Sequence, residues 1–68
     1  MNHLPDNLKR LRFRSNRSQQ QLCNKLSGIN AVQYGHWERG VNQPSLNGLV
    51  QLAELYGVSL DDLILRKL

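Results

Sequence analysis

The segment between residues 30 and 38 carries hydrogen-bonding and small apolar side chains within one short helical pattern. The amide of Gln33 can pair with N6 and N7 of adenine, and the imidazole of His36 can hydrogen-bond N7 or O6 of guanine. Ala31 or Val32 can pack on the methyl group of thymine. One good bidentate contact discriminates between bases by about 1–3 kcal/mol, so few such side chains are needed. The chemistry on offer is therefore the reading of base edges in double-stranded DNA.

These side chains also have alternative interpretations. Gln33 lies three residues after Asn30, where its amide would be occupied in a capping box. His36 can instead be a surface histidine without a partner. Gly35 destabilises a helix interior, yet its missing side chain would let a base or the DNA backbone approach closely. The sequence leaves these alternatives open.

A second set of side chains suits phosphate groups. Residues 7–37 carry a charge of +6 with no Asp or Glu, whereas residues 38–68 carry −1 and Asp6 another −1. Neutralising phosphates releases counterions, so this one-sided charge indicates a nucleic-acid partner; the alternative is a solvated face that only maintains solubility. Not all the cations can face one duplex. The candidate phosphate-binding residues are Gln19, Arg10, Arg14, Arg17, Lys25, Arg39 and Asn42.

Two capped helical patterns joined by a Ser-Gly turn position these residues. Ser18 with Gln21 forms a capping box that starts a helix over residues 19–26, and the same spacing at Asn30 starts a second helix over 31–38. Gly28 is expected to take the positive-φ conformation that ends the first of these helices. The pattern is that of a helix-turn-helix at about residues 18–40.

The second helix of this pair has two different faces. Three large apolar residues are expected to point inward, and small or polar residues outward, which suits a groove better than a core. Burial of the aromatic residues is favoured over stacking on single-stranded bases. The inward residues are Ile29, Tyr34 and Trp37, and the outward ones are Ala31, Val32, Gly35 and His36.

Apolar residues at helical spacing predict three further helices: from Pro5 to about Ser15, between the cap Ser45 and Gly57, and a short one after the cap Ser59. Phe13 lies off the apolar stripe of the first, and Gly48 weakens the fourth by up to about 1 kcal/mol. The expected fold is all-α with five helices. Core residues expected from the last two helices are Leu46, Leu49, Val50, Leu52, Ala53, Tyr56, Leu60, Leu63 and Ile64.

Length and composition allow one small domain over residues 1–68. A chain this short buries only about 60% of its unfolded surface, so well-packed helices must stabilise it. Cys23 lies on an apolar stripe and has no second cysteine, which favours a reduced core residue over a redox or metal role. We expect no cofactor and no metal, and neither a membrane span nor an export signal, hence a cytoplasmic protein.

Several motifs follow one another at fixed spacing along nearly the whole chain: Ser18-Gln19, then Glu38-Arg39-Gly40, Pro44-Ser45-Leu46, Leu52-Ala53-Glu54 and Gly57-Val58-Ser59-Leu60. In this order they resemble the lambda-repressor-like domain of the Cro/cI (XRE) family of transcription regulators. The resemblance implies a five-helix DNA-binding domain, base contacts by Asn30, Ala31, Val32, Gln33 and His36, and a phosphate contact by Gln19.

The resemblance also implies a function and a location. We expect a sequence-specific transcriptional regulator, more often a repressor, that binds a palindromic operator as a homodimer in the cytoplasm of a bacterial or phage-infected cell, associated with the nucleoid. If the protein has no further domain, as expected here, the dimer surface should lie on the last two helices and the tail. Its candidate residues are Leu55, Leu65 and Leu68.

Two positions depart from the family pattern. The turn Leu26-Ser27-Gly28-Ile29 is one residue longer than usual when measured from Ser18, so the following helix can be displaced or rotated. Arg17 stands before the cap where an apolar residue is common, which frees its guanidinium to approach DNA.

Other functions are weaker interpretations of the sequence. An enzyme is disfavoured because His3, His36, Cys23 and the Asp61-Asp62 pair are scattered and show no metal-ligand or nucleophile spacing. A protein-interaction module of the same fold would have no need of the basic half. RNA binding is disfavoured by the lack of exposed aromatic platforms.

Overall fold

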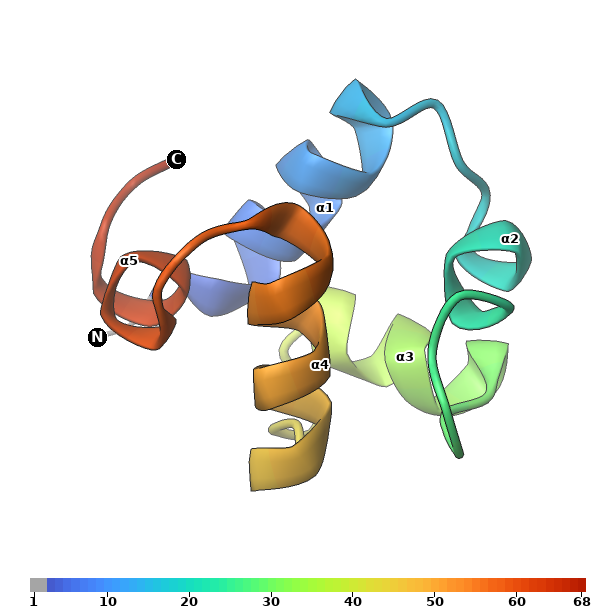
Figure 1. Ribbon diagram of the computed structural model, residues 1–68. Helices are drawn as coiled ribbons and strands as arrows, with labels where there is room; N and C mark the ends of the chain where they lie inside the picture. The colour runs from blue at the N-terminus through green and yellow to red at the C-terminus, as the bar shows by residue number, and fades with distance from the viewer. Residues whose placement is uncertain (1–2) are drawn as a thin grey trace.

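The computed structural model describes residues 3–68, which form five helices and no strand (Figure 1). Residues 1 and 2, which the expected domain includes, lie outside the described residues. The all-α prediction with five helices is confirmed. The helices are α1 (Leu4–Arg14), α2 (Gln19–Cys23), α3 (Ala31–Glu38), α4 (Leu46–Tyr56) and α5 (Leu60–Leu65).

Local capping explains where most helices start and where α4 ends. The hydroxyl of Ser18 accepts from N of Gln21 at 3.1 Å, and Oε1 of Gln21 accepts from N of Ser18 at 2.8 Å, which completes the predicted capping box. Ser45 and Ser59 cap α4 and α5 through their hydroxyls. Gly57, in the left-handed conformation, ends α4. These predictions are confirmed. Sequence could predict these contacts because each joins residues close together in the chain.

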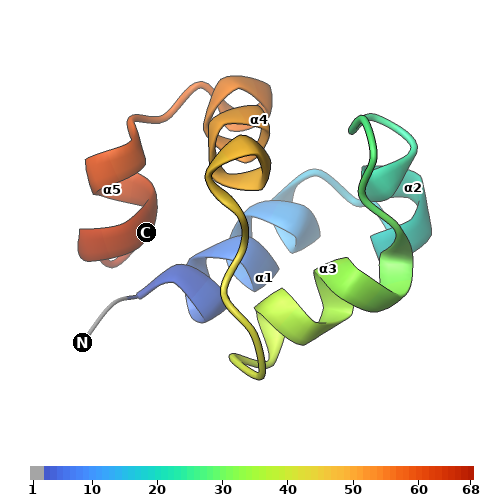
Figure 2. The ribbon, with the colours of Figure 1, turned by 90° about the horizontal axis from the view of Figure 1, so that it is seen from below.

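The core lies where α1 crosses the other helices. α1 packs on α3 and α5, α2 packs on α3, and α4 packs on α5 (Figure 2). Tyr34 and Trp37 are both buried and meet edge to face, with ring centroids 6.0 Å apart. Cys23 is buried, as predicted. The fully buried apolar residues of the core include Leu8, Leu22, Leu52 and Leu63.

Gly48 has a packing role that helix propensity does not reveal. It is buried, and a Cβ atom added there would lie 2.7 Å from Cη2 of Trp37. Such a distance is too short for a carbon contact, so α4 approaches the indole ring only because residue 48 has no side chain. The glycine that weakens α4 locally therefore permits its packing against α3.

α2 is shorter than predicted, because it ends at Cys23 rather than at residue 26. The next residues turn tightly: N of Lys25 donates to O of Leu22, and N of Leu26 donates to O of Cys23. Cysteine and asparagine are weak helix formers, and a five-residue helix does not propagate through them. Gly28 has the predicted positive φ, +76°, but lies beyond the end of α2 and shapes the turn instead.

Two residues predicted in the core are exposed. Leu46 is 71% exposed and Leu60 is 36% exposed. Each is the first residue of its helix, directly after the serine cap, so it lies at the end of the helix. Helical spacing alone does not reveal how far each helix projects beyond the core.

A buried asparagine joins α1 to the end of the chain. Nδ2 of Asn7 donates to the carbonyl oxygens of Leu63 at 2.8 Å and Arg66 at 2.6 Å, and its Oδ1 accepts from N of Leu68 at 3.0 Å. The side chain is fully buried and its polar atoms are satisfied. Sequence analysis missed this residue, although its spacing of three from Leu4 and four from Leu11 places it on the apolar stripe of α1.

Candidate nucleic-acid interface

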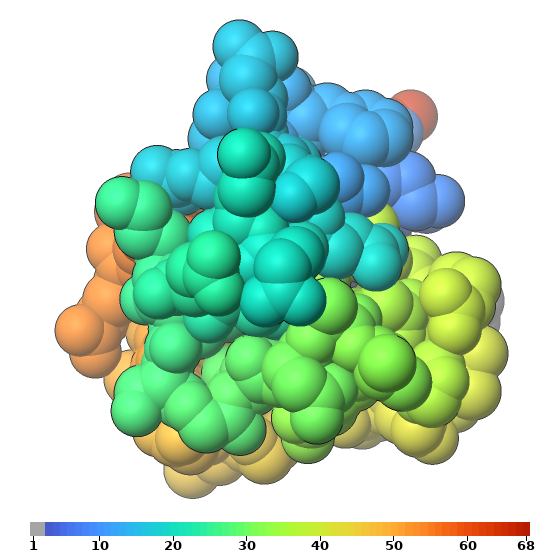
Figure 3. Space-filling model, turned by 90° about the vertical axis from the view of Figure 1, so that its right-hand side faces the viewer, coloured from blue at the N-terminus to red at the C-terminus, as the bar shows by residue number. Residues whose placement is uncertain are grey.

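The outward side of α3 forms part of one face of the molecule together with α2 and the turn between them. Figure 3 shows this face, with the end of α1 above it and the loop after α3 beside it. Tyr34 and Trp37 anchor α3 inward, as predicted. Val32 is 71% exposed and Gln33 is exposed, whereas Ala31 is half-buried. An apolar and an amide side chain therefore stand free next to each other.

The start of α3 leaves the Gln33 amide unused. Oδ1 of Asn30 accepts from the backbone N of Gln33 at 2.8 Å, which caps the helix. Within residues 3–68 the Gln33 side chain makes no return bond, so the second capping box is only half formed. The Gln33 amide keeps its donor and acceptor for an outside partner.

Gly35 lies on the outward side of α3, as predicted, but it is buried there under neighbouring side chains. An added Cβ would lie 3.1 Å from Oε1 of Gln19 and 3.3 Å from Nη1 of Arg39, so these two long side chains fold over the glycine. Gln19, Val32 and Arg39, with Ala31 and Gly35, line an open hollow of about 300 Å³. The tertiary structure thus brings two predicted phosphate-binding residues together with two predicted base-reading residues.

His36 and Asn42 meet at the other end of α3. Nδ2 of Asn42 lies 3.4 Å from Nδ1 of His36, and His36 is half-buried. The loop that carries Asn42 turns back through Gly40, whose φ is +72°. His36 is therefore not the partnerless surface histidine of the alternative interpretation.

A buried ion pair supports this face from below. Nε of Arg12 donates to Oε2 of Glu38 at 2.6 Å, and Nη2 of Arg12 donates to Oε1 of Glu38 at 3.0 Å. Nε2 of Gln19 donates to the same Oε1 at 3.2 Å. The network joins α1, α2 and α3, and its bond to Glu38 holds the side chain of Gln19 in place.

The Glu38 carboxylate is held in its charged form. Burial raises the pKa of Glu38, but hydrogen bonds, with that from Arg12 the strongest, outweigh burial and leave the pKa below its ordinary value. Only 2% of the Glu38 side chain is exposed. The positive charge of Arg12 is therefore neutralised inside the protein and adds little to the electrostatic potential at the surface.

Sequence analysis missed the role of Glu38. Its spacing of four from the buried Tyr34 places it on the inward face of α3, and this spacing could have indicated its burial. Its partner Arg12 lies 26 residues away in the chain, so no local pattern could identify the pair.

The remaining cations lie at several places. Nη2 of Arg14 donates to the carbonyl oxygen of Leu68 at 2.7 Å, and Lys25 lines a different hollow beside α4. Arg10 and Arg17 are half-buried, and Nη1 of Arg10 is enclosed without a hydrogen-bond partner among the described residues. Of the predicted phosphate-binding cations, Arg39 is the one that lines the hollow over α3.

The three residues expected at a dimer surface lie in different environments. Leu55 is half-buried and packs against the core, whereas Leu65 is 66% exposed. Leu68 is half-buried, and its backbone is held by Asn7 and Arg14.

No metal or membrane feature is found in the described part of the chain. Residues 3–68 contain no group of three His, Cys, Asp or Glu side chains placed to hold a metal ion. Among the described helices, none has the length and apolar character needed to span a bilayer.

Comparison with known proteins identifies one family. A family model described as helix-turn-helix matches residues 8–63, which is most of the chain. No curated protein and no solved structure gives a match.

Proposed function

Because the chain belongs to the Cro/cI (XRE) type of helix-turn-helix family, whose members bind double-stranded DNA and regulate transcription, we propose that it is a sequence-specific repressor. In this proposal α3 enters the major groove of a palindromic operator, and two copies of the chain bind its two halves. The five helices have the lambda-repressor-like arrangement of the family. Such binding would place the protein in the cytoplasm, on nucleoid or phage DNA.

One observation carries the proposal: the exposed side of α3 offers unused recognition groups next to phosphate-binding groups. The Gln33 amide has no partner within the described residues, and Val32 is exposed beside it. Arg39 and Gln19 line the adjoining hollow. This combination suits a groove, in which base edges lie between two rows of phosphates.

We assign base reading to the outward residues of α3 and phosphate binding to the residues around them. Gln33 and His36 supply hydrogen bonds, and Val32 with Ala31 supplies apolar contact for a thymine methyl group. Asn30 caps the helix, and we assign it to the end of α3 that would enter the groove. Gln19, Arg39 and Asn42 are the phosphate-binding residues next to α3, with Arg10, Arg14, Arg17 and Lys25 as outer candidates.

Selection of bound duplexes from a random library tests the proposal. A single enriched motif with two-fold symmetry and half-sites about one helical turn apart is expected. Fluorescence anisotropy with the enriched duplex and with a random duplex then gives the two affinities. Equal affinities would contradict sequence specificity, whereas salt-insensitive binding or no binding at low salt would instead favour a protein-interaction module.

Homodimerisation is tested separately by analytical ultracentrifugation, with and without the selected duplex. We propose that Leu65, with Leu55 and Leu68, contributes apolar surface to the interface, because Leu65 is exposed on α5. Leu65→Ser is expected to weaken binding to a full palindrome more than binding to a half-site. A monomer both free and on DNA would contradict this part of the proposal.

A further inference from the structure

The turn between α2 and α3 is held to α4 at one point. The backbone N of Ser27 donates to Oε1 of Gln51 at 2.7 Å, and Nε2 of Gln51 donates to the carbonyl oxygen of Ser27 at 2.9 Å. One side-chain amide therefore pairs with both backbone groups of a residue that lies 24 positions away in the chain.

Within the described residues, the segment 27–29 makes no other hydrogen bond. The tight backbone bonds after α2 end at Leu26, and helical bonds resume where N of Tyr34 donates to O of Asn30. An added Cβ at Gly28 would meet no atom within 4 Å, so the tip of the turn is uncovered. The polar attachment of this segment therefore depends on Gln51.

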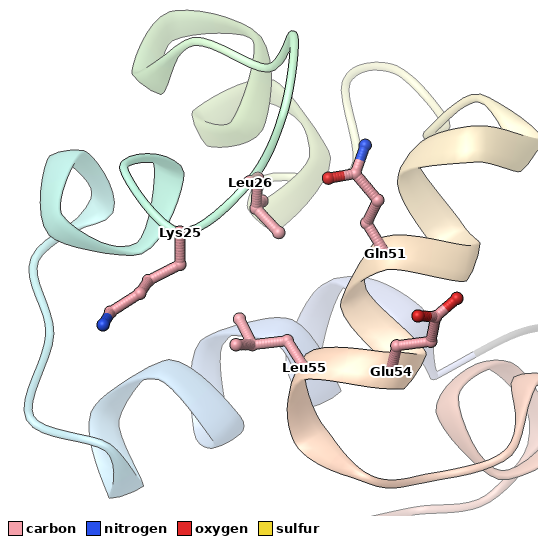
Figure 4. A pocket seen from close by; sticks show the side chains of 5 residues that line it. All are labelled: Lys25, Leu26, Gln51, Glu54 and Leu55. Carbon is pink, nitrogen blue, oxygen red and sulfur yellow. The ribbon is translucent and has the colours of Figure 1, made fainter.

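Apolar packing accompanies this attachment. Leu26 from the turn and Leu55 from α4 point toward each other, and Gln51 reaches up to the turn (Figure 4). Ile29, the last apolar residue before α3, packs against the core. The hydrogen bonds of Gln51 thus fix the backbone between two apolar anchors, directly before α3 begins.

We propose that Gln51 is a positioning residue that sets the orientation in which α3 meets DNA, an inference that rests on the proposed function. Without the hydrogen bonds of Gln51, the segment 27–29 would have no polar attachment to the described residues, and α3 would be free to shift. Gln51 removes that freedom by tying Ser27 to α4. Base contacts depend on this orientation and read the sequence, whereas phosphate contacts carry no sequence information.

The variant Gln51→Met tests this role, because it keeps the length of the side chain and removes both hydrogen bonds. Asn47→Met is the matched control: Asn47 is an exposed amide on α4, four residues earlier, with no hydrogen bond from its side chain in the described part. We expect Gln51→Met to bind the selected duplex about three- to tenfold more weakly, the range that loss of ordinary hydrogen bonds implies. Its affinity for random duplex should be unchanged.

Hydrogen exchange gives a second readout that does not depend on DNA. The amide of Ser27 should exchange about tenfold faster in Gln51→Met than in the parent, while Asn47→Met leaves it unchanged. Gln51→Ala serves in the same assays if the methionine variant does not fold.

The outcomes separate the two proposals. A parent protein that selects no duplex would overturn the proposed function and the positioning role with it. A selective parent whose folded Gln51 variants keep the same ratio of affinities would overturn the positioning role alone. Unchanged exchange of Ser27 would show that the two hydrogen bonds do not hold the turn, and would also overturn it.

Discussion

At the scale of single residues, the polar groups on the outward side of α3 are used differently from the buried polar groups of the fold. Asn7 and Glu38 are buried and their hydrogen-bonding groups are occupied inside the fold. Gln33 is exposed and its amide is unused among the described residues. An exposed amide next to the exposed Val32 is suited to an external ligand with both polar and apolar edges.

His36→Ala is expected to relax the preference for one base position, because only a contact to a base edge carries sequence information. The loss for the preferred base should be about 1–3 kcal/mol, measured by anisotropy with a set of single-base variants of the selected duplex. Arg39→Ala is the comparison and should weaken all duplexes to a similar extent. Unchanged selectivity in His36→Ala would remove this residue from the base-reading set.

At the scale of helices, the position of α3 depends on contacts with α1, α2 and α4 that lie far away in the sequence. Arg12 on α1 and Gln19 on α2 both hydrogen-bond the carboxylate of Glu38. Gly48 allows α4 to pack close to Trp37. Three helices therefore hold α3 in place, so the orientation of its outward face depends on how all of them pack.

Gly48→Ala is expected to destabilise the protein, although alanine is the better helix former. The gain in propensity is at most about 1 kcal/mol, whereas forcing a methyl group against a buried ring costs about 1–3 kcal/mol. The contact at 2.7 Å to Cη2 of Trp37 places this site toward the upper end of that cost. The free energy of unfolding, from urea denaturation, should therefore fall by about 1–2 kcal/mol.

Asn47→Ala, one residue earlier on the exposed side of α4, is the control and should change the free energy of unfolding by no more than about 0.5 kcal/mol. Greater stability in Gly48→Ala would mean that α4 can move away from the indole ring without loss.

The Arg12–Glu38 pair makes stability depend on pH in the acid range. Because the pKa of Glu38 is lowered by folding, its contribution is fully present above the ordinary value for glutamate, about 4.3, and is lost as pH falls through the lower value of the folded state. The urea midpoint should therefore drop on acidification below about pH 4.3, and the Glu38 carboxyl should titrate below the ordinary glutamate value.

Glu38→Gln tests the assignment. Removing one partner of a buried pair typically costs about 3–5 kcal/mol, so this variant should be less stable at pH 7, and its urea midpoint should depend less on pH between 5 and 3, a range taken around the glutamate value of about 4.3. Carbon NMR titration of the carboxyl group in the parent gives the same answer without a mutation. A Glu38 midpoint at or above the ordinary glutamate value of about 4.3 would contradict the lowered pKa.

At the scale of the whole molecule, folding redistributes the charge that the sequence displays. The basic region of residues 7–37 contains six cations, but Arg12 is neutralised by Glu38, and Arg14 and Lys25 lie away from the hollow over α3. The positive electrostatic potential near α3 is therefore weaker than the number of cations in residues 7–37 indicates.

The salt dependence of binding measures how many cations act. If two or three phosphates are neutralised per subunit of a dimer, the logarithm of the affinity should fall with the logarithm of salt concentration with a slope of about −4 to −5. Arg39→Gln should make this slope less steep, whereas Arg12, already paired, should contribute nothing to it. A slope near zero would indicate that counterion release does not drive binding.

The sequence by itself determined the features that depend on neighbours along the chain. Serine caps, the left-handed Gly57 and the inward spacing of Tyr34 and Trp37 predicted where most helices lie and how α3 is turned. The helix-turn-helix interpretation followed from these local patterns, because a cap or a helical face needs only residues a few positions apart.

Only the tertiary structure decided which distant residues meet. It buried Glu38 against Arg12, covered Gly35 with Gln19 and Arg39, left Leu46 exposed, and tied Ser27 to Gln51. These contacts join different helices, or a helix to a turn, and so depend on how the helices cross. A crossing is set by the packing of the whole core, which no local spacing records.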